Sequence, residues 1–206
     1  MNIIDVCCKM QELGWVAATD GNVSVRTDCG CLITPSCVRK GDVTSGMLVE
    51  VDGNGAVVNP SQYKPSSEAK MHLRCYSERG DIGAVIHAHP PCATAFAIAG
   101  RGLDDDSLME AVLTIGRVPL APYATPSTEE VGDSVSPLLQ GHSVILLQNH
   151  GALAAGADLL TAFNRMETLE HWAKTVLNAQ LLGGTKAISR ENIDRLAGLR
   201  ERYGIV

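Results

Sequence analysis

The chain has 206 residues, a length that suits a single domain, residues 1–206, with a substantial hydrophobic core. Hydrophobic residues make up 45% and charged residues 19% of the sequence, which is a globular composition rather than a disordered one. The formal net charge of −6 excludes a generally basic surface, so we expect no nucleic-acid partner, and an anionic substrate would need local donors.

The sequence shows no pattern typical of a membrane or secreted protein. No apolar run approaches the roughly 20 residues that a membrane helix needs. The N-terminal residues lack the basic start and apolar stretch of a secretory signal. The seven cysteines are an odd number, in a chain too large to depend on disulfides. We therefore expect reduced thiols, a cytoplasmic location and no membrane partner.

The first part of the chain predicts one helix and two hairpins. Apolar residues recur at helical spacing over residues 3–13, and Gly14 ends that helix. Residues 22–34 and 47–58 each contain two extended segments that flank a turn rich in Asp, Gly or Asn. Two successive hairpins predict an antiparallel region of a sheet.

The remaining chain predicts buried strands that alternate with helices. Residues 82–89 and 143–148 are apolar and contain β-branched members, and residues 118–123 are extended. Helices are expected to begin at the capping residues Ser66-Ser67, Ser127-Thr128, Asp158 and Ser189, and after Pro90-Pro91. The pattern as a whole predicts one sheet with helices on both faces.

Three of the six histidines lie where predicted strands end. His87 and His89 are two residues apart on a strand, so their side chains leave the same face with Cβ atoms roughly 6.5 Å apart. His150 follows another predicted strand, residues 143–148, and lies beside Gly151, which would let the backbone turn away. Three imidazoles and one vacant position are the ligand set of a catalytic zinc, because a substrate oxygen can take the vacancy. An isolated His-x-His pair would favour hydrogen-bonded core histidines, but the third histidine favours a metal site.

Glu68 is predicted to stand in the first turn of the helix that Ser66 and Ser67 open. An acid is favourable at the positive end of a helix, and this position also suits a general base close to the metal. The free N–H groups and the two hydroxyls at the same helix start would form a phosphate cradle. Glu68 and His72, four residues apart, are an alternative metal-binding pair.

Seven short motifs occur in order along the chain. They are Gly21-Asn22, Ile33-Thr34-Pro35-Ser36, Lys64-Pro65-Ser66-Ser67-Glu68, His87-Ala88-His89, Ala121-Pro122-Tyr123-Ala124-Thr125, Gln148-Asn149-His150-Gly151 and Arg202-Tyr203-Gly204. With these motifs the chain resembles the class II aldolase family of L-fuculose-1-phosphate aldolase-like proteins, within the aldolase/adducin head superfamily. The resemblance implies an α/β fold, with three αβα layers around a central, mainly antiparallel sheet. It also implies a homotetramer with active sites at subunit interfaces.

The resemblance further implies roles for the site residues. His87, His89 and His150 match the ligands of one Zn²⁺ per subunit. Glu68 matches the catalytic base and is a possible fourth ligand. The positions that match the binding site for the substrate phosphate are Asn22, Ser36, Cys37, Ser66 and Ser67.

Two tyrosines complete the implied catalytic set. Tyr123 matches a general acid that reaches the site of a neighbouring subunit, and Tyr203 matches a tyrosine of a mobile C-terminal tail. The chain departs from the family at Cys37, where glycine is usual. It also has only three residues after Tyr203.

The reaction implied is zinc-dependent retro-aldol cleavage of a ketose-1-phosphate to dihydroxyacetone phosphate and an aldehyde. The substrate would be fuculose-1-phosphate or a related deoxy- or pentulose-1-phosphate. A methylthioribulose-1-phosphate dehydratase, which keeps the glutamate and the three histidines, is the alternative. Pentulose-phosphate epimerases usually have Asp at the position of Glu68, and non-catalytic adducin-like heads typically lack a complete metal site, so both fit less well.

Overall fold

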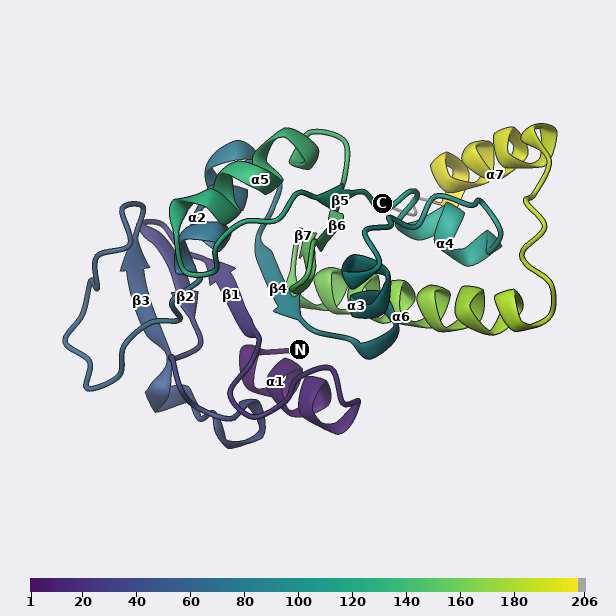
Figure 1. Ribbon diagram of the computed structural model, residues 1–206. Helices are drawn as coiled ribbons and strands as arrows, with labels where there is room; N and C mark the ends of the chain where they lie inside the picture. Colours follow the sequence, from purple (N-terminus) through teal and green to yellow (C-terminus); the bar gives the residue numbers. More distant parts are fainter. Residues whose placement is uncertain (204–206) are drawn as a thin grey trace.

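Seven strands form one open sheet in the computed structural model, which describes residues 1–203 and their side chains up to Leu199 (Figure 1). The strand order is β3-β2-β1-β4-β7-β6-β5, and every neighbouring pair is antiparallel except β5 and β6. The strands are β1 (Asn22–Arg26), β2 (Gly30–Ile33), β3 (Val49–Asp52), β4 (Ala84–Ala88), β5 (Leu120–Ala121), β6 (Val144–Leu147) and β7 (Gly151–Gly156). The predicted mainly antiparallel sheet is confirmed.

Helices cover both faces of this sheet, as predicted. One face packs against α1 (Ile3–Glu12), α3 (Pro91–Ile98), α4 (Met109–Thr114) and α6 (Leu159–Leu181). The other face packs against α2 (Ala69–Glu78) and α5 (Glu129–Leu139), which lie side by side (Figure 1). Two short 3-10 helices, η1 (Lys40–Asp42) and η2 (Ser45–Met47), precede β3, and α7 (Arg190–Tyr203) packs on α4. None of the described helices is both long enough and apolar enough to span a bilayer.

The two predicted hairpins differ in the structure. The first is present as β1 and β2. In the second, only the first arm becomes a strand, β3, and the return segment pairs through a single bridge between Val51 and Val57. Val57 and Val58 are 45% and 44% exposed, so little apolar burial holds this segment against the edge of the sheet.

The sequence pattern did not predict β7 or α4. Strand β7, with the sequence Gly-Ala-Leu-Ala-Ala-Gly, is buried along its whole length between β4 and β6. Glycine and alanine are depleted in strands, so propensity disfavours this assignment. Small residues are needed here because α6 crosses closely: a Cβ added at Gly156 would lie 2.6 Å from the Ala162 backbone nitrogen.

Candidate metal centre and active site

The three predicted metal ligands lie together at one end of the central strands. His87 is in β4, His89 follows the end of that strand, and His150 is in the turn between β6 and β7. Because β4 pairs with β7, this turn is brought beside the two histidines of β4. The three rings have centroids 4.6–5.1 Å apart, and one ligand nitrogen from each lies within 4.8 Å of the others.

The backbone around His150 differs from the expectation that Gly151 makes the turn. Asn149 adopts the left-handed conformation, with φ of 58°, whereas Gly151 begins β7. A Cβ added at Gly151 would lie 2.5 Å from Cδ2 of His89 and 2.6 Å from the Ala88 carbonyl oxygen. The missing side chain therefore makes room for the imidazole of His89.

The hydrogen bonds and burial of the histidines suit metal ligation. His87 Nδ1 donates to the Ala152 carbonyl oxygen at 2.9 Å, which leaves the Nε2 lone pair free. His89 Nε2 lies 3.1 Å from His87 Nε2, so the two nitrogens converge on one point. Burial lowers the pKa of all three histidines, that of His89 to about 4, which keeps the rings in the neutral form that binds metals.

Glu68 lies against the same three rings. Its Oε2 is 3.2 Å from His87 Nε2, and its Oε1 is 3.5 Å from His150 Nε2. Burial raises the pKa of this carboxyl group, but the histidines and the Asn22 amide lower it by a larger amount. The resulting pKa is about 2, so the group is ionised. Within the described part of the chain, the buried Oε1 atom has no hydrogen-bond partner. Three imidazole nitrogens and an unsatisfied carboxylate oxygen form a donor set that fits Zn²⁺.

The N-terminus of α2 differs slightly from the prediction. The helix begins at Ala69 with Glu68 as the N-cap, so Ser66 and Ser67 precede the helix instead of capping it. The Ser66 hydroxyl accepts a hydrogen bond from the backbone N–H of Glu68 at 3.3 Å. His72 uses one ring nitrogen on Ser24 and the other on Asn22, which argues against the alternative Glu68–His72 metal pair.

A pocket of about 250 Å³ opens above the histidines. Its walls bring together residues that are far apart in sequence, including all five predicted phosphate-binding positions. These are Asn22, Ser36, Cys37, Ser66 and Ser67. Cys37 adopts φ of 59°, so the cysteine holds the left-handed conformation that glycine adopts without strain.

The two predicted tyrosines are placed differently. Tyr123 is 62% exposed and is not among the described residues that line the pocket. Its backbone N–H donates to the side chain of Gln148 at 3.1 Å. Tyr203 is the last residue of α7, and its side chain lies outside the described residues.

The pocket also contains residues that the sequence did not indicate. Asp20 lines it, with Oδ2 3.6 Å from Nδ1 of His89, and Pro126 and Ser127 form part of the wall. Asp20 directly precedes the Gly21-Asn22 motif, but nothing in its spacing reveals that His89 lies nearby. Only the pairing of β1 with β4 brings the two segments together.

Comparisons with known proteins identify the family of the chain. A family model described as "Class II Aldolase and Adducin N-terminal domain" matches residues 1–177. L-fuculose phosphate aldolase of Escherichia coli (strain K12) is 38% identical over 204 residues, which cover 98% of this chain and 94% of that protein. The 5-methylthioribulose-1-phosphate/5-deoxyribulose-1-phosphate aldolase of Rhodospirillum rubrum is 30% identical, covering 98% of this chain and 90% of that protein. A solved L-fuculose 1-phosphate aldolase superimposes with a TM-score of 0.89 at 33% identity, covering 97% and 94% of the two chains.

Proposed function

The chain belongs to the class II aldolase and adducin family and is an aldolase-type lyase, and we propose that it cleaves a ketose-1-phosphate by a zinc-dependent retro-aldol reaction. The products are dihydroxyacetone phosphate and an aldehyde. The observation that carries the proposal is the convergence of His87, His89 and His150 on the Glu68 carboxylate, at the base of a polar pocket. Its buried Oε1 atom has no hydrogen-bond partner among the described residues.

The pocket walls supply the phosphate site in this proposal. The hydroxyl groups of Ser36, Ser66 and Ser67 and the amide of Asn22 line one pocket and can donate hydrogen bonds to phosphate oxygens. Lys40 adds a buried positive charge behind these walls. Its Nζ donates to the carbonyl oxygens of Thr19 at 3.0 Å and Val38 at 2.8 Å, although burial lowers its pKa. These local groups offset the net negative charge of the protein.

The three histidines would hold Zn²⁺, with Glu68 as a possible fourth ligand. A bound Zn²⁺ supplies Lewis-acid chemistry, stabilising the negative charge that develops on substrate oxygens as the carbon–carbon bond breaks. The substrate hydroxyl that becomes the aldehyde loses a proton as the bond breaks, and the carbon that becomes nucleophilic in the phosphate-bearing half gains one. The ionised Glu68 carboxylate takes up the released proton and delivers it to that carbon, so no net proton is consumed. Its Oε2 is occupied by the Asn22 amide at 2.8 Å, so Oε1 is the oxygen that handles this proton.

A tyrosine moves the proton at the aldehyde oxygen. We assign this role to Tyr123 of a neighbouring subunit in a homotetramer, because within its own chain this side chain is exposed. Tyr203 would belong to the same interface site.

The relatives favour cleavage over dehydration. Both the fuculose-phosphate and the methylthioribulose-phosphate relatives are named as aldolases, so an aldolase fits better than the alternative dehydratase. Their substrates share the phosphate-bearing end that the pocket would bind. The sugars differ at the aldehyde end.

The test is a panel of fuculose-1-phosphate, ribulose-1-phosphate, deoxyribulose-1-phosphate and methylthioribulose-1-phosphate. We expect release of dihydroxyacetone phosphate from at least one, loss of activity with a chelator, and recovery with Zn²⁺. Elemental analysis of untagged protein should find one zinc per chain, greatly reduced by His89→Ala. Metal content unaffected by substitution of any of the three histidines, or no product from any sugar, would contradict the proposal.

A further inference from the structure

A row of buried polar side chains extends from Glu68 into the protein interior. Asn22 Nδ2 donates to Glu68 Oε2 at 2.8 Å, and Asn22 Oδ1 lies 2.5 Å from His72 Nε2. On its other side, His72 Nδ1 lies 2.7 Å from the Ser24 hydroxyl. The Ser24 hydroxyl lies 2.6 Å from the Tyr76 hydroxyl. Four consecutive hydrogen bonds therefore join Tyr76 to Glu68.

Two regular elements produce this row. Glu68, His72 and Tyr76 are spaced four residues apart along α2 and its N-cap, so they share one face of the helix. Asn22 and Ser24 are two apart in β1, so they share one face of the strand. Asn22, Ser24, His72 and Tyr76 are 0–5% exposed, so the groups must satisfy one another instead of bonding to water.

The chemistry of these groups determines the direction of every hydrogen bond. The ionised Glu68 carboxylate only accepts, so the Asn22 amide nitrogen faces it and the Asn22 oxygen faces His72. That oxygen only accepts, so His72 must donate from Nε2.

The remaining two bonds follow from the neutral form of His72. The His72 ring is 0% exposed and its described side-chain partners, Ser24 and Asn22, are neutral, so the ring is neutral and Nδ1 carries a lone pair. Ser24 therefore donates to Nδ1, and Tyr76 donates to Ser24. Each group in the row therefore donates to the neighbour that is closer to Glu68, and in such a chain each hydrogen bond polarises the next.

We propose that His72 is a positioning residue for the aldolase reaction. Its Nε2–H fixes the orientation of the Asn22 amide, and this amide in turn holds Glu68 Oε2. Glu68 Oε1 is then left to carry the substrate proton. This role rests on the proposed function. If the Asn22 amide turned over, its oxygen would face the carboxylate of Glu68, and two acceptors would oppose each other. The second hydrogen of Asn22 Nδ2 stays available for a substrate phosphate.

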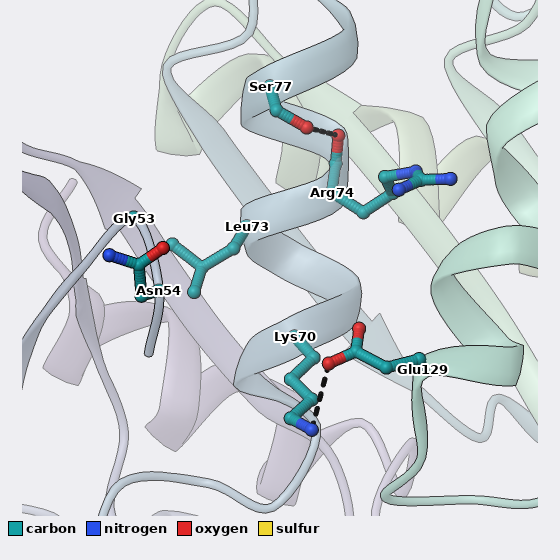
Figure 2. Close-up of a pocket in the computed structure, with 7 residues that line it drawn as sticks. All are labelled: Gly53, Asn54, Lys70, Leu73, Arg74, Ser77 and Glu129. Carbon is teal, nitrogen blue, oxygen red and sulfur yellow. Dashed lines mark hydrogen bonds and ion pairs between the residues drawn. The ribbon is translucent and has the colours of Figure 1, made fainter. Parts of the chain in front are cut away.

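The opposite face of α2 supplies a control. Figure 2 shows a second pocket beside α2, lined by Lys70, Leu73, Arg74 and Ser77 of the helix. Its cations are already paired, Lys70 with Glu129 at 2.8 Å and Arg74 with Asp133 at 2.8 Å. Lys70→Ala therefore changes the same helix without touching the buried row.

Two substitutions test the hydrogen bonds of the two His72 ring nitrogens one at a time. A glutamine amide can lie where the imidazole has Nε2, so His72→Gln can keep the donor to Asn22. An asparagine amide can lie where the ring has Nδ1, so His72→Asn keeps a partner for Ser24 but leaves the Asn22 oxygen unpaired. We expect kcat to fall about 10–100-fold in His72→Asn but only a few-fold in His72→Gln, with zinc content unchanged in both. Lys70→Ala should match the wild type.

A second measurement does not depend on activity. The imidazole ¹⁵N spectrum of the wild-type protein at neutral pH should show His72 protonated at Nε2 and bare at Nδ1. Protonation at Nδ1, or equal kcat in the two His72 variants, would overturn the inference. A wild-type protein that shows the expected tautomer but cleaves no sugar of the panel would instead refute the proposed function.

Discussion

At the scale of single residues, the two carboxylate oxygens of Glu68 have different surroundings. Oε2 accepts a hydrogen bond from the Asn22 amide, whereas Oε1 is buried without a hydrogen-bond partner in the described structure. A buried, unsatisfied oxygen is unfavourable for stability, and such atoms are typical of catalytic or metal-binding positions. The proposed reaction uses this oxygen to carry the substrate proton.

Glu68→Gln is therefore expected to lower kcat about 10²–10⁴-fold, because an amide has the same shape but cannot accept the proton. Zinc content should stay near one per chain, since the three histidines remain. Turnover on the best substrate of the panel and elemental analysis measure the two effects. The control is Glu129→Gln, which changes an exposed carboxylate on α5 and should leave turnover unchanged. Near-normal turnover in Glu68→Gln would assign the base to another residue.

Cys37, in the wall of the pocket, has an unfavourable backbone conformation. Its φ of 59° lies in the left-handed region, which costs a residue with a Cβ about 1–2 kcal/mol. Cys37→Gly should relieve that strain, less the greater unfolded-state entropy of glycine, for a net gain of about 0.5–1 kcal/mol in the free energy of unfolding. Urea unfolding measures this gain. Cys37→Ala removes the thiol but keeps the Cβ, so equal stability of the two variants would show that backbone strain is not the cause.

At the scale of secondary-structure elements, the small side chains of β7 allow close packing in the central part of the sheet. It is paired on both sides, with β4 and β6, and every residue in it is buried. Its first glycine lies against the ring of His89, and its last lies against the start of α6. The same strand therefore supports both the sheet packing and the geometry of the metal centre.

Gly151→Ala tests this dual role. The new Cβ would lie 2.5 Å from His89 Cδ2 and 2.6 Å from a backbone oxygen, so the ring or the strand must move. We expect a loss of about 1–3 kcal/mol in stability and weaker zinc binding in a chelator competition. The matched control is Gly141→Ala, because a Cβ there meets nothing within 4 Å. Zinc affinity equal to that of the wild type would mean that His89 tolerates the displacement.

At the scale of the whole molecule, the exposed Tyr123 suggests a site completed by another chain. Residues 118–126 include three prolines in nine positions, which favours an extended backbone with reduced conformational freedom. Tyrosine is also common at interfaces without any chemical role, because it combines apolar area with a polar tip. Kinetics of the Phe variant distinguish these roles, since only the hydroxyl is removed.

We expect Tyr123→Phe to lower kcat without changing oligomer size or zinc content. Mixed oligomers of Tyr123→Phe and His89→Ala subunits should regain part of the activity, because some interfaces then pair an intact metal centre with an intact tyrosine. Subunit exchange is verified by mass spectrometry, and homo-oligomers of each variant are the controls. Activity no higher than the sum of those controls would place Tyr123 outside a shared site.

Local patterns in the sequence determined most of the elements and the core of the metal centre. Asp158 is the N-cap of helix α6, and its side chain accepts a hydrogen bond from the Thr161 N–H. The two-residue spacing of His87 and His89 places their side chains on one face of the strand. These features depend on residues a few positions apart, so the order of residues suffices. The motifs that resemble the aldolase family supplied the roles of the pocket residues.

Only the tertiary structure decided the features that depend on distant contacts. Strand β7 has weak strand propensity and forms because β4 and β6 flank it and α6 needs small residues beside it. The hydrogen bond from Asn22 to Glu68 joins residues 46 positions apart, and the one from Ser24 to His72 joins residues 48 apart. Sequence spacing alone cannot reveal these neighbours, because the pairing of β1 with β4 and the packing of α2 on the sheet determine which side chains meet.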